Sequence, residues 1–298
     1  MRSNSKPRLL WLQSITCNGN THSFLNHPSL FSILSHFKIV YHPALESVYS
    51  MQDVIKRELA CDVLILEGSF IEEGFVKGGV EVSSMIETYA RKAKHIISAG
   101  TCASFGGIFK QKDPEKISGF CFDLDKKTSR YDMYASKLIS LPGCPIHPQW
   151  LSYVLLMIID EKKIDIDILH RPVELYGYTV HTGCTRNEYF EWKIDTKNFG
   201  LKEGCLFYEQ GCQGPYTRGS CNKILWNDTS SKTRVGTPCF GCTEPNYPQS
   251  SLFRTKTNMG IPATMPLGVP RRAYLTLTGV AKGFKIKRFS ERLLEYDR

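Results

Sequence analysis

The residues most able to do chemistry in this sequence are its cysteines, of which there are eleven. In an oxidising compartment they would predict disulfides with one thiol left over, whereas in a reducing compartment the same count predicts metal binding. Six of them fall between Cys184 and Cys242, in a stretch rich in Gly, Pro and Asn with few continuous apolar runs. Such a stretch has little apolar surface to bury, and metal–thiolate bonds can supply the missing stability. The positions of these cysteines therefore favour metal binding over disulfides.

This cysteine-rich stretch contains two candidate ligand sets. The first combines one imidazole with three thiolates, at His181, Cys184, Cys205 and Cys212. The second has three thiolates, at Cys221, Cys239 and Cys242. Structural zinc takes four ligands in a closed tetrahedron, which the first set would satisfy and the second would not. Iron–sulfur clusters use cysteine and occasionally histidine. On spacing alone, zinc and iron–sulfur both stay open.

Three further cysteines each follow a short apolar run, in loops that contain glycine or proline: Cys17, Cys102 and Cys144. The runs, residues 9–12, 95–98 and 138–141, have the composition of strands. Because the carboxyl ends of the strands in a doubly wound sheet gather at one edge, where ligands bind, we expect the three thiols to converge. The alternative is three unrelated buried cysteines, which pack as small hydrophobic residues.

The elements that would position these thiols alternate between strands and helices over the first half of the chain. Further strands are expected at residues 38–41 and 63–66, and helices at 23–37, 83–94 and 149–162. This alternation predicts an α/β domain with a doubly wound parallel sheet over residues 1–165. Residues 166–298 have few periodic segments and many turn formers, so we expect a smaller, irregular domain there.

Composition and charge narrow the class of protein. A chain of 298 residues with 42% hydrophobic residues is long enough for two domains and excludes wholesale disorder. The longest apolar run, about residues 150–159, is too short for a membrane span of ~20 residues, and no signal-peptide core stands near the N-terminus. We therefore expect a cytoplasmic protein. The net charge of +9 comes without an aromatic–basic motif, so no nucleic-acid partner is expected.

Several motifs around these residues resemble those of the small subunit of nickel–iron hydrogenases. In chain order they are Trp11-Leu12-Gln13 before Cys17, the glycine-rich segment 100–107, Pro142-Gly143-Cys144-Pro145-x-His147-Pro148, Arg171-Pro172, His181-x-x-Cys184, Gly211-Cys212-x-Gly214-Pro215 and Pro238-Cys239-x-Gly241-Cys242-x-Glu244-Pro245-Asn246. They occur in the family's order and cover the chain from residue 11 to about 246.

The resemblance implies an electron-transfer subunit with a flavodoxin-like first domain, whose partner, the large subunit, carries the nickel–iron site. It implies three iron–sulfur clusters. The proximal cluster would be held by Cys17, Cys102 and Cys144. The distal cluster would be held by His181, Cys184, Cys205 and Cys212. The medial cluster, commonly 3Fe–4S where the others are 4Fe–4S, would be held by Cys221, Cys239 and Cys242. An electron acceptor or a membrane cytochrome subunit would be a further partner, giving a peripheral association with the membrane.

The first loop departs from the family, because Cys17-x-x-Asn20 stands where the family has Cys-x-x-Cys. An amide oxygen is a neutral, weak ligand for iron. The proximal site is therefore a four-iron cluster with Asn20 or water at one corner, a three-iron cluster, or a damaged site. Gly19 and Gly107 stand where some oxygen-tolerant members carry two additional cysteines, so that mechanism of tolerance is not expected. The seven-residue step from Cys205 to Cys212 is one longer than the family's.

Three other residues complete the predictions from the sequence. Cys61 and Cys121 are expected to be non-ligating. Glu67 follows a predicted strand, and is either a group that moves protons or a structural carboxylate. Asn20 and the missing export signal also support an alternative function, that of a non-catalytic small-subunit paralogue acting in hydrogenase assembly or hydrogen sensing.

Overall fold

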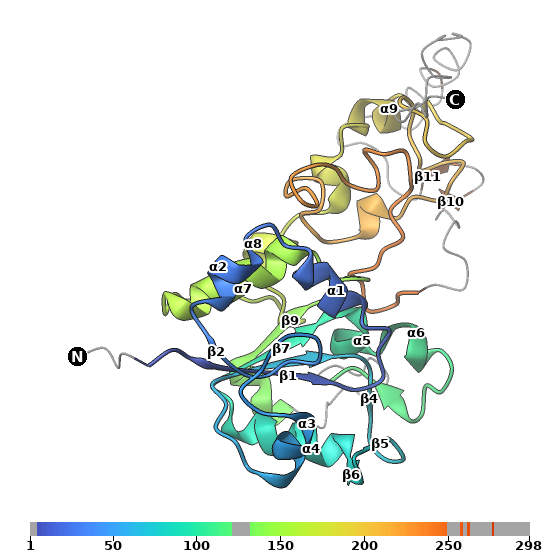
Figure 1. The fold of residues 1–298 in the computed structure, drawn as a ribbon. Coiled ribbons are helices and arrows are strands. Elements are labelled where there is room, and N and C mark those ends of the chain that lie inside the picture. Colours follow the sequence, from blue (N-terminus) through green and yellow to red (C-terminus); the bar gives the residue numbers. More distant parts are fainter. Residues whose placement is uncertain (1–4, 121–131, 249–256, 259–260, 263–275, 277–298) are drawn as a thin grey trace, which may run out of the picture. The chain divides into compact units, whose positions relative to one another are not determined.

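The computed structural model describes residues 5–120, 132–248, 257–258, 261–262 and 276 (Figure 1). The chain divides into two compact units, which we call the first and second unit. The first comprises Met1–Gly177 and Cys242–Tyr247, and the second comprises Tyr178–Gly241 and Pro248–Arg298. Residues 166–177 belong to the first unit because they pack on the sheet: Ser140 N donates to His170 O, and the Tyr176 hydroxyl donates to Pro142 O.

The first unit is built on five parallel strands. They are β1 (Arg8–Gln13), β2 (Lys38–Tyr41), β3 (Val63–Glu67), β7 (His95–Ala99) and β9 (Leu138–Leu141), in the order β2-β1-β3-β7-β9. Leu10 pairs with Leu64, and Ile65 with Ile97. This is the flavodoxin-like order of a doubly wound sheet. The α/β prediction and all five predicted strands are confirmed.

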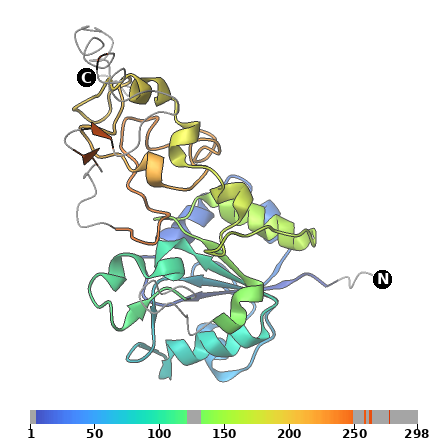
Figure 2. The same cartoon turned by 180° about the vertical axis from the view of Figure 1, so that it is seen from behind.

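Helices cover both faces of this sheet (Figures 1 and 2). One face carries α1 (Gly19–Leu25), α2 (Leu30–Leu34) and α7 (Pro148–Ile159), and the other carries α3 (Met51–Lys56) and α4 (Val82–Lys92). Because both faces are covered, the strands read as continuous apolar runs, and every residue of β3 is buried. The helix expected at 23–37 is two short helices, since Pro28 lies between α1 and α2 and cannot donate a helical hydrogen bond.

Short elements complete the first unit. They are the antiparallel pair β4 (Phe70–Ile71) and β8 (Ile117–Ser118), the hairpin β5 (Val76–Lys77) and β6 (Val80–Glu81), the helices α5 (Gly100–Phe105), α6 (Gly107–Lys110) and α8 (Val173–Tyr176), and a 3₁₀ helix at Asp132–Lys137. The apolar core between the sheet, α3 and α4 includes Leu64, Ile86 and Tyr89.

The second unit has little regular structure, as the turn-rich sequence predicts. Its elements are the 3₁₀ helices η2 (Val180–Gly183) and η3 (Gly214–Tyr216), the helix α9 (Asn187–Glu191) and the two-residue strands β10 (Thr257–Asn258) and β11 (Ile261–Pro262). Its buried apolar cluster consists of Val180, Phe190, Cys205, Leu206, Phe207, Cys212 and Cys239. Three of these seven residues are cysteines. Over the described residues of both units, no helix is long and apolar enough to cross a membrane.

Candidate metal centres

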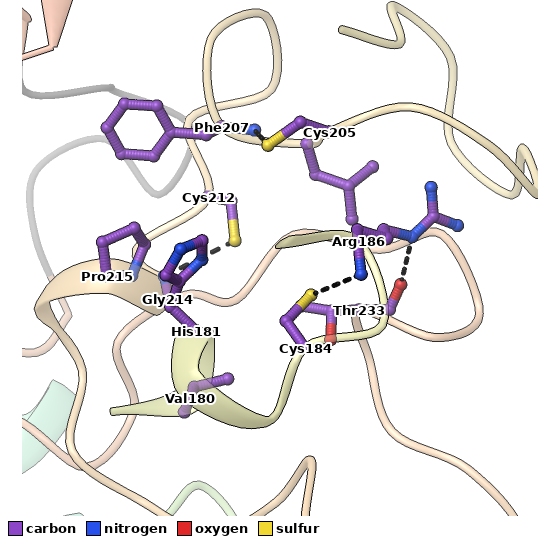
Figure 3. A pocket seen from close by; sticks show the side chains of 11 residues that line it. Val180, His181, Cys184, Arg186, Cys205, Phe207, Cys212, Gly214, Pro215 and Thr233 are labelled. Atoms are coloured by element: carbon purple, nitrogen blue, oxygen red, sulfur yellow. Dashed lines mark hydrogen bonds between the residues drawn. The ribbon is translucent and has the colours of Figure 1, made fainter. Parts of the chain in front are cut away.

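All four residues of the first predicted ligand set line one pocket of the second unit (Figure 3). His181 lies on η2 and Cys184 directly follows it, with Cys184 N donating to His181 O at 2.9 Å. Cys205 is held by its own backbone, which donates to Ile194 O at 2.7 Å and accepts from Thr196 N at 2.9 Å. Residues from two stretches of the chain, 181–184 and 205–212, thus meet around one space, as a cluster site requires.

Each of the three sulfurs in this pocket accepts a backbone hydrogen bond. Cys184 Sγ accepts from Arg186 N at 3.4 Å and Cys205 Sγ from Phe207 N at 3.3 Å (Figure 3). Cys212 Sγ accepts two, from Gly214 N at 3.4 Å and Cys239 N at 3.2 Å. Amide donors aimed at sulfur stabilise thiolate over thiol, and hydrogen bonds to sulfur are one of the levers that set a cluster's reduction potential.

Burial governs the protonation of these ligands. It raises the pKa of Cys212 to about 11 and that of Cys205 well above its ordinary value, against the smaller lowering by the amide donors. Such thiols lose their protons only to a strongly bound metal cation. Burial also lowers the pKa of His181, which favours the neutral imidazole that binds metal. The donor set fits a bound metal group.

A single metal ion and a cluster make different demands on the spacing of their ligands. Among the described residues, no three His, Cys, Asp or Glu side chains are close enough together to hold one metal ion. Structural zinc needs four ligands on one ion, at ~2.0–2.3 Å. A 4Fe–4S cluster takes one ligand per iron, so its ligands stand further apart.

In the first unit, the second group of predicted ligands follows the carboxyl ends of neighbouring strands. Cys17 comes after β1, Cys102 lies on α5 directly after β7, and Cys144 comes after β9. Burial, then the neighbouring thiols of Cys144 and Cys17, raise the pKa of Cys102 to about 11. The mutual influence of these thiols means that the three loops come together at this edge of the sheet.

Two glycines make room for these sulfurs. A Cβ on Gly107, whose φ is +50°, would stand 2.7 Å from Cys102 Sγ, and a Cβ on Gly19 would stand 3.2 Å from Cys17 Sγ. Any side chain at position 107 would therefore force the Cys102 sulfur to move.

Asn20 is buried beside these loops, and its amide is already engaged. Its Oδ1 accepts from Ile146 N at 2.9 Å, and its backbone N donates to Glu67 Oε1 at 3.0 Å. Ser23 Oγ donates to Ile146 O at 2.6 Å, so α1 is tied to the Cys144 loop at two points. In this arrangement Asn20 supports the loop that carries a thiol.

Glu67 is a structural carboxylate in this structure. It is 1% exposed and accepts from Trp11 Nε1, Gln13 Nε2, Thr21 and the backbone of α1's first turn. A carboxylate at a helix N-terminus is stabilised by the unpaired N–H groups there. Of its two interpretations, these contacts favour the structural one.

The remaining cysteines are distributed as follows. Cys221 and Cys239 belong to the second unit and Cys242 to the first, so the medial set stays a prediction. Cys61 is packed in the apolar core, where burial raises its pKa to about 12, which suits a thiol that binds no metal. Cys121 lies outside the described residues.

Two residues near the thiols were not found from the sequence. Tyr247 hydrogen-bonds the Cys144 side chain, and burial, followed by the charges of nearby thiols, raises its pKa, so its hydroxyl stays protonated and donates. Arg186 lines the pocket of the second unit and is 3% exposed. The one signal in the sequence is an arginine two positions after Cys184, a spacing with no meaning until the fold is known.

The two parts of the chain that carry the predicted ligands are an α/β unit with thiols at its ligand edge and a second unit with cysteines in its core. Family models match both parts. The model "NADH ubiquinone oxidoreductase, 20 Kd subunit" matches residues 17–158, and the model of the C-terminal part of the "NiFe/NiFeSe hydrogenase small subunit" matches residues 176–254. The periplasmic [NiFe] hydrogenase small subunit of Solidesulfovibrio fructosivorans is 30% identical over 258 residues, which are 81% of this chain and 79% of that one. The chain belongs to the family of nickel–iron hydrogenase small subunits.

Other relatives agree with this assignment. The hydrogenase-2 small chain of Escherichia coli K12 is 28% identical over 259 residues, 80% of this chain and 67% of that one. Among solved structures, the actinobacterial-type NiFe-hydrogenase of Ralstonia eutropha H16 matches with a TM-score of 0.72 over 98% of this chain and 95% of that one, at 22% identity. The [NiFeSe] hydrogenase of Desulfovibrio vulgaris Hildenborough matches with a TM-score of 0.69 over 85% of this chain and 99% of that one, at 23% identity. These two structures share the fold.

Proposed function

We propose that this chain is the electron-transfer subunit of a nickel–iron hydrogenase. It relays electrons between a nickel–iron site in a large-subunit partner and an acceptor, through three iron–sulfur clusters. When bound, the clusters supply the one-electron carriers. The chain's own residues hold them, exclude water and set their potentials: Cys17, Cys102 and Cys144 at the proximal site, Cys221, Cys239 and Cys242 at a medial 3Fe–4S site, and His181, Cys184, Cys205 and Cys212 at the distal 4Fe–4S site.

One observation supports this proposal above the others. The four predicted distal ligands come from two stretches of the chain and line one pocket, and every sulfur among them accepts a hydrogen bond from a backbone amide. Buried cysteines that served only as packing would need neither the shared pocket nor the donors. The seven-residue step from Cys205 to Cys212 is accommodated, because Cys212 N donates to Leu206 O at 3.1 Å and returns the chain to the pocket.

The test is anaerobic purification from the native host, followed by metal analysis and electron paramagnetic resonance. A nickel-containing partner should co-purify, and iron should be present in amounts that fit three clusters. His181→Ala should remove or alter one cluster signal, whereas Cys61→Ser, the matched control, should leave every signal unchanged. A chain that purifies alone and without iron would refute the proposal.

Asn20 favours a second candidate, a non-catalytic paralogue in hydrogenase assembly or hydrogen sensing. Three thiols with a structural amide in the fourth place would interrupt a relay at its first cluster. Deletion of the gene separates the two candidates when hydrogen uptake by an intact, separate hydrogenase is assayed. Loss of that uptake supports the paralogue, and unchanged uptake supports the relay.

We also propose that the chain works in the cytoplasm, either free or peripherally bound to the membrane through a cytochrome partner. No disulfide joins any of the ten described cysteines, which suits a reducing compartment. Fractionation of the host with antibody detection tests this: the signal should be in the cytoplasmic or inner-membrane fraction, and a periplasmic signal would contradict it.

A further inference from the structure

Arg186 stands out among the side chains around the pocket of the second unit. It follows Cys184 by two residues, and its backbone N is the donor to that sulfur (Figure 3). Its side chain is 3% exposed, so its guanidinium has almost no contact with water. A guanidinium keeps its charge even when buried, and burying a charge is costly unless an opposite charge compensates it.

The hydrogen bonds of Arg186 satisfy its donors without neutralising its charge. Nε donates to Thr233 O at 2.7 Å, Nη1 to Gly204 O at 2.7 Å, and Nη2 to Leu201 O. All three acceptors are neutral backbone carbonyls. Within the described part of the chain, no carboxylate forms an ion pair with this guanidinium.

The first unit contains a buried arginine for comparison. Arg171 is also 3% exposed, but its Nε lies 2.9 Å from Asp167 Oδ2 and its Nη1 lies 3.5 Å from Glu244 Oε1. This chain therefore supplies carboxylates to a buried guanidinium where the arginine has only a structural role. The absence of such a partner at Arg186 indicates a different counter-charge.

The charges that act on Arg186 identify that counter-charge. The ionisable groups whose charges would act on it are Cys184, Cys205 and Cys212, together with the more exposed Glu203, and the three cysteines become thiolates when they bind a metal group. Three of these four groups are predicted ligands of the distal cluster. The Gly204 and Leu201 carbonyls stand just before Cys205 in the chain, so the same guanidinium also holds the loop that carries a ligand.

We propose that Arg186 is the counter-ion of the distal cluster and raises its reduction potential. The inference rests on the proposed function, since it needs a cluster in this pocket. Each electron that enters a cluster adds one negative charge, and a fixed positive charge nearby stabilises the reduced state more than the oxidised state. Low water content around the guanidinium strengthens the effect. Arg186 is thus a positioning residue that acts through the ligands and does not touch iron.

The experiment is a redox titration of the anaerobically purified protein with its partner subunit, monitored by electron paramagnetic resonance. The distal signal is identified first as the one that His181→Cys changes. Arg186→Gln and Arg186→Met both remove the charge and differ in how they satisfy the three carbonyls. Arg186→Lys keeps the charge. Arg234→Gln is the matched control, because Arg234 belongs to the same unit but does not line the pocket.

We expect Arg186→Gln and Arg186→Met to shift the distal midpoint potential to more negative values, Arg186→Lys to shift it less, and Arg234→Gln to leave it unchanged. Full iron with an unchanged distal potential in either charge-removing variant would overturn the proposal. If neither of those variants keeps the distal cluster, the Arg186→Lys variant tests the proposal in their place. Retention of the cluster with lysine supports a requirement for charge, and its loss shows that only the shape of the guanidinium matters. Absence of a distal signal in the unmodified protein would instead refute the proposed function.

Discussion

At the scale of single residues, Asn20 stands where the resemblance to the family implies a cysteine. Its amide oxygen accepts from Ile146 N, and its position brings α1 against the loop of Cys144. A carboxamide is well suited to that hydrogen bond and poorly suited to iron. The position therefore supports a ligand-bearing loop without supplying a thiolate of its own.

Replacing this amide with a thiol tests the proximal site. Asn20→Cys should add a fourth thiolate and make the site less easily reduced, because an anionic ligand stabilises the oxidised state. Iron should rise by about one per chain if the native site is a three-iron cluster and stay constant if it already has four. Metal analysis and potentiometric titration measure both.

Asn20→Ser is the control for this change. It loses the same bond to Ile146, at a cost of about 1 kcal/mol in the free energy of unfolding, and adds no soft ligand. If Asn20→Cys and Asn20→Ser give the same iron, spectrum and potential, residue 20 is not beside a cluster and the proximal assignment is wrong.

Tyr247 offers a second test of the same site from the opposite end of the sequence. Its hydroxyl donates to the Cys144 side chain. A hydrogen bond to a ligating sulfur withdraws charge from it and raises the cluster's potential. Tyr247→Phe should therefore lower the midpoint potential of the proximal cluster, as measured by redox titration. Tyr153→Phe, on the outer part of α7, should not change it, and equal potentials in all three proteins would contradict the contact.

Candidate ligands could be named from the sequence because the chemistry of metal–sulfur sites restricts the residue type, and the prediction drew only on cysteine and histidine. Arg186 and Tyr247 could not, because arginine and tyrosine are common and their roles depend on tertiary contacts. Arg186 reaches Thr233, and Tyr247 reaches Cys144, across distances in sequence that no local pattern encodes. The hydrogen bond from Ile146 N to Asn20 Oδ1 could not be predicted for the same reason.

At the scale of elements, the strands were predictable and the helices less so. Buried parallel strands carry unbroken apolar runs that stand out in any sequence, as Leu9–Leu12 does. The expected helix at 23–37 is interrupted at Pro28. Residues 166–177 pack on the sheet through backbone hydrogen bonds, such as the one from Ser140 N to His170 O. Backbone hydrogen bonds of this kind cannot be recognised from amino-acid composition.

The junction of β1 and β2 carries a pH-sensitive contact. His42 follows β2 and packs on Trp11 of β1 with ring centroids 4.9 Å apart, and its Nδ1 accepts from Ala44 N. Burial lowers its pKa from 6.5 to about 4, with Glu67 opposing this in part. A His that is held neutral by the fold stabilises it fully above the unfolded pKa, and that stability is lost as the pH falls toward the folded pKa.

We therefore expect the free energy of unfolding of the first unit to fall by up to about 3 kcal/mol between pH 6.5 and pH 4. Denaturant titrations at a series of pH values measure this. His42→Gln should flatten the dependence, whereas the same change at the exposed His22 of α1 should not. A pH dependence unchanged by His42→Gln would assign the effect to other groups.

At the scale of the whole molecule, the two units differ in what stabilises them. The first has a sheet covered on both faces and a large aliphatic core. The second has mostly irregular backbone, and three of the seven residues in its buried apolar cluster are cysteines. Metal binding in such a unit is coupled to folding.

Removal of iron should consequently unfold the second unit and spare the first. After anaerobic chelation, hydrogen exchange should increase over residues 178–241, whereas strands β1, β3 and β7 should remain protected. Reconstitution with iron and sulfide should restore protection. Unchanged exchange in the second unit after complete iron loss would show that its own contacts are sufficient to fold it.

The return of Cys242–Tyr247 to the first unit has a consequence for the timing of biosynthesis. The Thr101 hydroxyl donates to Cys242 O, Arg171 Nη1 donates to Thr243 O, and Tyr247 reaches Cys144. A ribosome that adds ~5–20 residues per second completes Tyr247 roughly 5–20 s after Cys144. During that interval the nascent sheet can form, but its thiol edge lacks these late contacts. We therefore expect a chain that ends before residue 242 to form the sheet but to lack these contacts beside its thiol edge.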